Sequence, residues 1–298
     1  MDWILLENDE YINLKETLFS GQVFNFYETD ENEYTGSIYF FIISLLQKDK
    51  NVYYKILSTK IINQNLIDKY IRRFFTLQIN YKTNIPVLNP TGLRLINNSL
   101  IATLFSFICS ANNNVKRITK MVKFLYTQGE FACKYKNIDF FHFPSLDKLN
   151  NIENILKIEG FGYRSKYICK TANLLLNSDT FIEIRKFDDL VQEEIIKCGY
   201  NEGLDLSSKI NFNSLKKNLV KLSGIGPKVR DCICLMGLGL FEVVPIDTHI
   251  FKHSKLLFDL KENRLTSKIY KDIQDKFVQK FGKYAGIHQL YIFKDYLH

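Results

Sequence analysis

The chain has little of what marks metalloproteins and membrane proteins. Its six cysteines are scattered over 298 residues, and the closest pair, Cys232 and Cys234, is separated by a single residue. This spacing fits neither a CxxC zinc site nor an iron–sulfur loop. The most apolar run, Ile38 to Leu46, is far too short to cross a bilayer. We therefore expect no metal ligand set, no iron–sulfur cluster and no membrane partner.

Further absences concern compartment and organisation. The first ten residues, MDWILLENDE, are acidic where a signal peptide needs a basic segment. Unpaired cysteine spacing favours a reducing compartment. The chain shows no low-complexity tail, no long linker and no signal for oligomerisation. We expect a soluble intracellular monomer.

Charge gives the first hint of a partner. The 40 Lys and Arg residues exceed the 32 Asp and Glu residues, which leaves a formal charge of +8. A basic excess favours a polyanion, because each cation placed on a phosphate releases a condensed counterion. The same excess of lysine also arises from a biased genome composition, so charge alone does not establish nucleic-acid binding.

The order of patterns predicts an α+β fold. Aromatic and β-branched residues at Tyr34–Leu46 and Val52–Leu57 indicate strands around a polar turn at Gln47–Asn51. A helical pattern follows at Ile62–Phe75, and from Asn98 onward almost every segment has helical spacing. The clearest helices are Leu100–Cys109, Val115–Tyr126, Leu146–Ile158, Arg164–Leu176 and Phe212–Leu222. We predict a small N-terminal antiparallel β-sheet domain, residues 1–95, packed on a larger all-helical body, residues 96–298.

A short motif occurs twice. The segment from Lys157 to Arg164 resembles the segment from Lys221 to Lys228, and both place Gly-x-Gly between two amphipathic helices. Glycine ends helices readily in the left-handed region, so both copies can be ordinary helix C-caps. Alternatively, the turn exposes backbone amides at the next helix N-terminus, where a phosphate docks.

The second copy is followed by residues suited to chemistry. Pro227 fits the first turn of a helix, which places Lys228 near the positive end of the helix dipole. There the ammonium form is disfavoured, and a neutral amine is a nucleophile. A solvated or phosphate-binding lysine is the plainer interpretation of this residue.

An aspartate follows in a second informative position. Asp247 comes after Pro245 and precedes an apparent helix, where an aspartate is usually an N-cap. A capping carboxylate is held in one orientation, so it can also stabilise positive charge on a sugar ring as a glycosidic bond breaks. The two roles are compatible.

These elements resemble the helix–hairpin–helix DNA glycosylase superfamily, through Leu222-Ser-Gly-Ile-Gly-Pro-Lys228 and Val244-Pro-Ile-Asp247. The resemblance sharpens to the eukaryotic-type 8-oxoguanine DNA glycosylases through five segments in the family's order. These are Ser20-Gly-Gln-Val-Phe24, Phe105-Ser-Phe-Ile-Cys-Ser-Ala-Asn-Asn-Asn114, Gly160-Phe-Gly-Tyr-Arg164, Asp231-Cys-Ile-Cys-Leu-Met236 and Tyr284-Ala-Gly-Ile-His-Gln289.

The resemblance implies a catalytic pair and a base pocket. It makes Lys228 the nucleophile that attacks C1′ and forms a Schiff base, with an associated lyase activity, and Asp247 the group that stabilises the sugar cation. It implies that the Gly21 carbonyl reads the N7–H that 8-oxoguanine has and guanine lacks. It also implies that the damaged base is bound by Gln289 at its edge and by Phe293 and Cys232 on its faces. Without the resemblance, core packing is the preferred interpretation of Phe293 and Cys232.

The resemblance further implies a partner, double-stranded DNA containing oxidised guanine opposite cytosine, and a nuclear location, with the mitochondrion as the alternative. Four residues would fill the gap left by the flipped base and read the orphaned cytosine: Asn112, Arg117, Tyr163 and Arg164. Four more would contact the DNA backbone: Gly224, Gly226, Val229 and His249. No cofactor is implied beyond a structural monovalent cation on the hairpin carbonyls.

The sequence departs from the family at one place and leaves two alternatives. Asn25-Phe26 stand where the family commonly has Arg-Trp, so packing behind Gly21 is expected to differ. A monofunctional alkylbase glycosylase activates water and usually lacks a lysine at the hairpin, which makes Lys228 an argument against it. A non-catalytic hairpin module would leave Asp247 and the Gly21 segment without a role.

Overall fold

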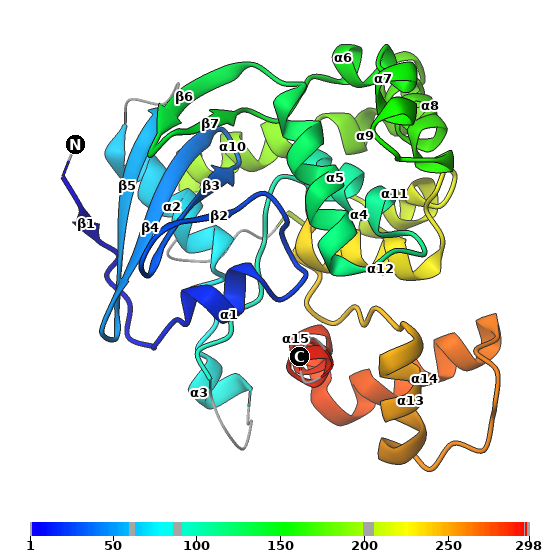
Figure 1. Ribbon diagram of the computed structural model, residues 1–298. Helices are drawn as coiled ribbons and strands as arrows, with labels where there is room; N and C mark the ends of the chain where they lie inside the picture. Colours follow the sequence, from blue (N-terminus) through cyan, green and yellow to red (C-terminus); the bar gives the residue numbers. More distant parts are fainter. Residues whose placement is uncertain (1, 60–62, 86–90, 199–205, 295, 297–298) are drawn as a thin grey trace.

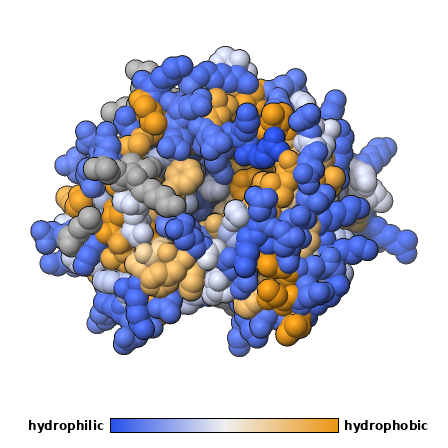
Figure 2. All heavy atoms as spheres, turned by 90° about the horizontal axis from the view of Figure 1, so that it is seen from above, coloured by the Kyte–Doolittle hydropathy of each residue, from blue (hydrophilic) through white to orange (hydrophobic). Residues whose placement is uncertain are grey.

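The computed structural model describes residues 2–59, 63–85, 91–198, 206–294 and 296. The first residue of the predicted Ile62–Phe75 helix lies outside these ranges. Among the described residues, no helix combines the length and the apolar character needed to cross a membrane. Seen from above, the surface is mostly hydrophilic, and its apolar side chains form separate groups (Figure 2).

The N-terminal part is a five-stranded antiparallel sheet in the order β1-β5-β4-β3-β2 (Figure 1). The strands are β1 (Ile4–Leu5), β2 (Tyr27–Asp30), β3 (Glu33–Ile38), β4 (Phe41–Lys48) and β5 (Asn51–Thr59), and the helices are α1 (Leu14–Leu18), α2 (Gln64–Phe74) and α3 (Tyr81–Asn84). Helix α2 packs on the sheet through Tyr70, whose ring centroid lies 5.5 Å from that of Phe41. On β5, Val52, Tyr54 and Ile56 are buried in alternation with more exposed residues, as expected for a strand with one face on the core.

The rest of the chain is mainly helical, which confirms the predicted α+β class. Its helices are α4 (Leu100–Ser110), α5 (Val115–Thr127), α6 (Leu146–Asn150), α7 (Glu153–Ile158), α8 (Tyr163–Asn177), η1 (Asp179–Phe181), α9 (Ile182–Arg185), α10 (Phe187–Cys198), α11 (Phe212–Leu219), α12 (Pro227–Met236), α13 (Thr248–Leu257), α14 (Ser267–Phe281), η2 (Gly282–Tyr284) and α15 (Ala285–Lys294). The predicted Leu146–Ile158 helix is two helices, because the chain leaves helical geometry between α6 and α7.

The body is not purely helical, because it contains one β-hairpin, β6 (Phe131–Tyr135) and β7 (Ile138–Phe141). Its turn residues Lys136 and Asn137 both have positive φ, as the favoured two-residue hairpin turn requires. The Lys136 ammonium forms ion pairs with Asp30 (2.5 Å) and Glu33 (2.8 Å) of the N-terminal sheet. The hairpin therefore closes against the sheet through charged contacts that its sequence pattern does not reveal.

Two hydrophobic cores support the fold. The larger core runs continuously from the sheet through the helices up to α12 and includes Leu290 of α15. The smaller core is formed by the last segments and includes Ile246, Ile250 and Phe277. Figure 1 shows α13, α14 and α15 as a group set apart from the sheet and the other helices. Helix α15 contributes to both cores and so joins them.

Polar groups attach the sheet to the C-terminal end of α12. The Met236 carbonyl accepts hydrogen bonds from the Asn98 backbone N–H (3.0 Å) and the Asn97 side chain (3.3 Å). The Tyr39 hydroxyl, at the turn between β3 and β4, lies 3.1 Å from the Asn97 carbonyl and accepts from Arg73 (2.9 Å). Asn97 and Asn98 also bind Tyr39 in the turn between β3 and β4. The same two residues therefore connect the sheet to α12.

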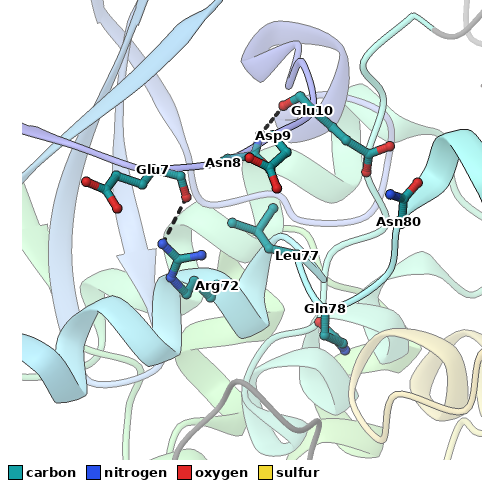
Figure 3. A pocket seen from close by; sticks show the side chains of 8 residues that line it. All are labelled: Glu7, Asn8, Asp9, Glu10, Arg72, Leu77, Gln78 and Asn80. Carbon is teal, nitrogen blue, oxygen red and sulfur yellow. Dashed lines mark hydrogen bonds between the residues drawn. The ribbon is translucent and has the colours of Figure 1, made fainter.

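A hollow on the N-terminal part is lined by acidic residues, and one of them, Glu10, holds parts of the fold together (Figure 3). Glu10 accepts hydrogen bonds from the backbone N–H groups of Tyr81 (2.9 Å) and Lys82 (2.8 Å) and forms an ion pair with Arg94 (2.8 Å). The Arg94 guanidinium is almost fully buried and also donates to the Phe75 carbonyl (3.0 Å). Burial alone would raise the pKa of the Glu10 carboxyl, but these donors outweigh it and lower the pKa below its ordinary value. The carboxylate is thus a fixed acceptor for a buried cation.

We predict that Glu10→Gln lowers the stability of the fold by roughly 1.5–3 kcal/mol, the usual worth of a hydrogen bond to a charged group. Because the folded-state pKa is lowered, the carboxylate stabilises the protein above its ordinary pKa of 4.5 and loses this effect as the pH falls. Thermal unfolding should therefore show a full difference between the two proteins at neutral pH and a shrinking one below about pH 4.5. Glu7→Gln, at an exposed carboxylate of the same hollow, is the control. It should change neither the thermal stability nor its dependence on pH.

Candidate active site

Six residues predicted from separate segments line one cavity. They are Gly21, Lys228, Cys232, Asp247, Gln289 and Phe293. Ser20, Gln22, Phe107, Met236, Pro245 and Leu290 complete the lining. The cavity lies where the larger core, α12 and the C-terminal helices meet. Its volume of about 40 Å³ holds a few water molecules and is far below that of ordinary ligand pockets, about 300–1,000 Å³.

The Gly21 wall of the cavity is fixed by its neighbour. Gly21 has φ of +79°, a conformation that favours glycine, whereas a Cβ there would meet only ordinary contacts, the nearest being Phe293 Cε1 at 3.7 Å. The buried Gln22 carboxamide donates to the Arg94 carbonyl (2.9 Å) and accepts from the Ile96 backbone N–H (2.8 Å). These two hydrogen bonds set the position of the Gly21 backbone.

Asn25 and Phe26, the two residues at which the sequence departs from the family pattern, are both buried. The buried Asn25 side chain donates to the Ser37 carbonyl (2.7 Å). Phe26 is also buried and lies under Gly36, where a Cβ would approach its ring to 2.8 Å. A small carboxamide and a phenyl ring therefore fill this space, and Gly36 leaves room for the ring.

Lys228 sits on the first turn of α12. Gly226 is the N-cap and Pro227 the first helical residue, as predicted. The lysine is half-buried, with Nζ 5.6 Å from the centre of the Phe107 ring. Burial raises the pKa of the Cys232 thiol, one turn along, and the nearby Lys228 charge opposes this rise. The amine is thus held against apolar and weakly polar groups in the cavity.

Asp247 is the N-cap of α13, which confirms that part of the prediction. Its Oδ1 accepts hydrogen bonds from the backbone N–H groups of His249 (2.9 Å) and Ile250 (2.8 Å). The carboxylate is half-buried and lines the cavity. Lys228 and Asp247, both among the described residues, share this cavity without forming an ion pair, so a substrate atom can be placed between them.

Sequence reasoning missed the group that sets their relative position. Asp231, almost fully buried on α12, accepts hydrogen bonds at Oδ2 from the Tyr270 hydroxyl (2.7 Å) and the Gln274 side chain (2.8 Å) of α14. Tyr270 in turn accepts from the Ile246 N–H (3.2 Å), and Gln274 donates to the Val244 carbonyl (2.9 Å). Burial and the Asp231 charge raise the pKa of Tyr270, so its hydroxyl remains a donor. This network ties the helix that carries Lys228 to the segment that ends in Asp247.

Gln289 is the polar group in the cavity that most directly indicates a ligand-binding role. The residue is only 6% exposed, yet its carboxamide forms no hydrogen bond with any described residue. Neither of its polar atoms is among the fully buried side-chain atoms that lack a partner, so the carboxamide is open to the cavity. Its donors and acceptor are therefore available to a ligand in the cavity.

Three of the four residues predicted to act at the flipped base meet at one loop tip, Ala111 and Asn112: Asn112 belongs to the tip, and Tyr163 and Arg164 bind it. The Tyr163 hydroxyl and the Arg164 Nε both donate to the Ala111 carbonyl (3.0 and 3.1 Å), and Arg164 Nη2 donates to the Asn112 carbonyl (2.9 Å). Arg117 Nη2 donates to the Gly160 carbonyl (2.8 Å). Asn112, Arg117 and Tyr163 are exposed, whereas Arg164 is buried beneath the tip. The structure thus brings Asn112, Tyr163 and Arg164 together and makes Arg164 a support of the tip, whereas Arg117 binds the turn at Gly160.

The predicted backbone contacts lie at two helix N-termini. Gly224 has φ of +83°, and a Cβ there would lie 2.7 Å from the Tyr167 ring, so only glycine fits the hairpin. The first intrahelical hydrogen bond of α12 is donated by Arg230, which leaves the Val229 N–H free. His249 is exposed on α13, and its ring centroid lies 5.2 Å from that of Tyr296 with the two rings tilted by 37°.

The hairpin can also supply ligands for the predicted monovalent cation. The Ser223 carbonyl accepts one hydrogen bond, from the Thr171 hydroxyl (3.2 Å). A carbonyl oxygen has two lone pairs, so one remains for an ion. Within the described residues, no group of three or more His, Cys, Asp or Glu side chains is placed to hold a metal ion.

Comparison with known proteins shows similarity along the whole chain. Residues 4–98 match the family model described as the 8-oxoguanine DNA glycosylase N-terminal domain. The chain is 31% identical to the N-glycosylase/DNA lyase OGG1 of Arabidopsis thaliana, over 95% of this chain and 76% of that protein. It is 29% identical to the N-glycosylase/DNA lyase of Saccharomyces cerevisiae, over 68% of this chain and 54% of that protein. Its fold is similar to that of the Clostridium acetobutylicum 8-oxoguanine glycosylase/lyase bound to double-stranded DNA with cytosine opposite 8-oxoG, with a TM-score of 0.74, 23% identity and coverage of 99% and 98%.

We predict that Tyr270→Phe lowers the free energy of unfolding by roughly 1.5–3 kcal/mol, because it removes a hydrogen bond to the buried Asp231 carboxylate. Urea unfolding followed by circular dichroism measures the change. Tyr284→Phe is the matched control, because the Tyr284 hydroxyl has no hydrogen-bond partner among the described residues. Equal effects of the two substitutions would show that the Asp231 contact adds no stability.

Proposed function

The chain belongs to the 8-oxoguanine DNA glycosylase family, and on this premise we propose that it excises 8-oxoguanine opposite cytosine from duplex DNA and then cleaves the strand as a lyase. The observation that carries the proposal is one cavity that combines a lysine amine, a fixed carboxylate and a carboxamide with no hydrogen bond to any described residue. An amine and a carboxylate serve sugar chemistry, and the carboxamide suits the edge of a base.

In the proposed mechanism, Lys228 is the nucleophile. Its neutral amine attacks C1′ of the damaged nucleotide, and the bond from C1′ to the base breaks as the base leaves. The sugar ring then opens to give a Schiff base between C1′ and Nζ. Loss of a C2′ proton expels the 3′ phosphate, and hydrolysis of the Schiff base returns the lysine. The half-buried position of Nζ next to Phe107, in the cavity that Asp247 also lines, supports this role.

Asp247 stabilises the positive charge that develops on the sugar. The α13 backbone N–H groups that bind its Oδ1 keep it in one orientation. A charge that is fixed in advance stabilises a transition state without reorganisation. The network around Asp231 keeps this carboxylate at a constant position relative to Lys228.

The base is recognised by its N7–H and its edge. The Gly21 carbonyl accepts from N7–H, which guanine lacks, and Gln289 binds the edge of the ring. Phe293 and Cys232 stack on its two faces. Because the cavity holds only a few water molecules, a purine enters only when part of the wall moves, and half-buried Phe293 beside Gly21 is the group best placed to move.

The DNA lies across the loop tip. Asn112 and Tyr163 fill the gap left by the extruded nucleotide, the exposed Arg117 reads the orphaned cytosine, and the buried Arg164 holds the tip in place. The hairpin around Gly224 and Gly226, the free Val229 N–H and the exposed His249 bind phosphates of the damaged strand. The turn at Gly224 and the free amide support this contact.

We predict that Lys228→Gln abolishes borohydride trapping on a duplex with 8-oxoguanine opposite cytosine, because the reduced adduct needs an amine. DNA binding, measured by fluorescence anisotropy, should be largely retained. Lys217→Gln on α11 removes an exposed lysine that does not line the cavity and should trap normally. A trapped adduct with the Lys228 variant would assign the nucleophile elsewhere.

We predict that Asp247→Asn slows single-turnover excision by about 10²–10³-fold, as for other preorganised electrostatic groups. Asparagine caps helices as well as aspartate does, so the melting temperature should stay close to that of the unaltered protein. Asp247→Ala removes cap and charge together and should also cost about 1 kcal/mol of stability. Undiminished excision by the asparagine variant contradicts the assigned role.

A further inference from the structure

A second cavity lies outside the proposed active site. It has a volume of about 610 Å³ and runs between α5 and the turn at Glu159 and Gly160. We call it the α5 groove. Arg117, Lys120 and Lys123 line it from α5, and Tyr27 lines it from β2. Neither the catalytic pair nor the base-binding residues take part in it.

The charge of the α5 groove favours an anion. Arg117, Lys120 and Lys123 follow one another at intervals of three, so they lie along one side of α5. Glu159 is the one carboxylate among the described lining residues. Lys123 is half-buried, and its Nζ lies 3.5 Å from the centre of the Tyr27 ring without an ion pair to any described residue. Burial lowers the pKa of Lys123, which shows that its charge is not compensated inside the protein.

The α5 groove and the active-site cavity lie on opposite faces of the first turn of α5. Val115 points toward Gly21, since its Cγ2 lies 3.9 Å from a Cβ built there. Arg117 points to the other side, where it binds the Gly160 carbonyl. Two residues along a helix correspond to a rotation of about 200°. A duplex that straddles the tip at Asn112 therefore has one strand beside the cavity and the other beside the groove.

We propose that the α5 groove binds consecutive phosphates of the DNA strand opposite the lesion. This proposal rests on the proposed function, which places the damaged strand at the cavity. From Arg117 to Lys123 the helix rises by about 9 Å, at about 1.5 Å per residue. That length corresponds to two or three phosphates at about 3.4 Å of duplex axis per nucleotide of one strand. Lys120 and Lys123 thus extend the contact of Arg117 along the undamaged strand.

The test is the salt dependence of binding by the double variant Lys120→Gln/Lys123→Gln. The slope of log K against log salt is negative, and each lost phosphate contact reduces its magnitude by about 0.9. The magnitude of the slope should therefore fall by about 1.8 in the double variant. The single variant Lys120→Gln should give about half this change, at a position where no described contact supports the fold. Glu159→Gln removes the repelling carboxylate and should tighten binding. An unchanged slope in the double variant would overturn the proposal.

The matched control is Lys48→Gln/Lys50→Gln, which removes two exposed lysines at the end of β4 and the turn to β5, across the sheet from α5 (Figure 1). This control should keep the slope of the unaltered protein. Thermal melts of all variants check that the fold is intact. A slope that falls equally in the control would show only a loss of general charge and would also overturn the proposal.

Neutral methylphosphonate linkages identify the strand. Placed in runs of three along the strand opposite the lesion, they should weaken binding of the unaltered protein at one position and affect the double variant much less there. Placed in the damaged strand, they should weaken both proteins equally. The opposite pattern would assign the groove to the damaged strand and refute the proposal. Borohydride trapping by the unaltered protein is scored separately, so loss of trapping counts against the proposed function and not against the slope.

Discussion

The structure of the active site depends on the buried carboxylate of Asp231. It lies on the same helix as Lys228, and its partners Tyr270 and Gln274 bind the backbone just before Asp247. Lys228 and Asp247 belong to segments about twenty residues apart, and hydrogen bonds to a single anion hold those segments together. A charge-assisted network of this kind has few alternative arrangements, because each lost contact leaves a buried polar group unpaired.

The two cores and their connections explain why the cavity lies where it does. Helix α12 is anchored to the sheet at its C-terminal end through Asn97 and Asn98, and to α14 through Asp231. The Gly21 segment is held by Gln22, which binds the backbone of Arg94 and Ile96. The α12 and Gly21 walls of the cavity are thus fixed by polar contacts, which suits a site that must place reacting atoms accurately.

Strand and helix patterning predicted the fold class, and family motifs such as Gly-Gln-x-Phe and Pro-Ile-Asp predicted the residues of the cavity, because such patterns are local. Local patterns could not predict the contacts between residues far apart in the chain. Asp231 belongs to a segment that we identified, but its partners lie 39 and 43 residues away, and nothing in their spacing marks them. Arg94 and Glu10 are 84 residues apart. The burial of Arg164 was missed for the same reason, since an arginine beside an exposed tyrosine looks like a surface residue.

The small volume of the cavity separates two steps of the proposed recognition, which are the entry of a base and the selection of the damaged one. If a purine enters by displacing Phe293 from Gly21, as proposed, this displacement costs the same free energy for every purine and lowers the affinity for each by one common factor. A uniform cost favours no nucleobase. Selectivity would then be left to contacts made after the wall has opened.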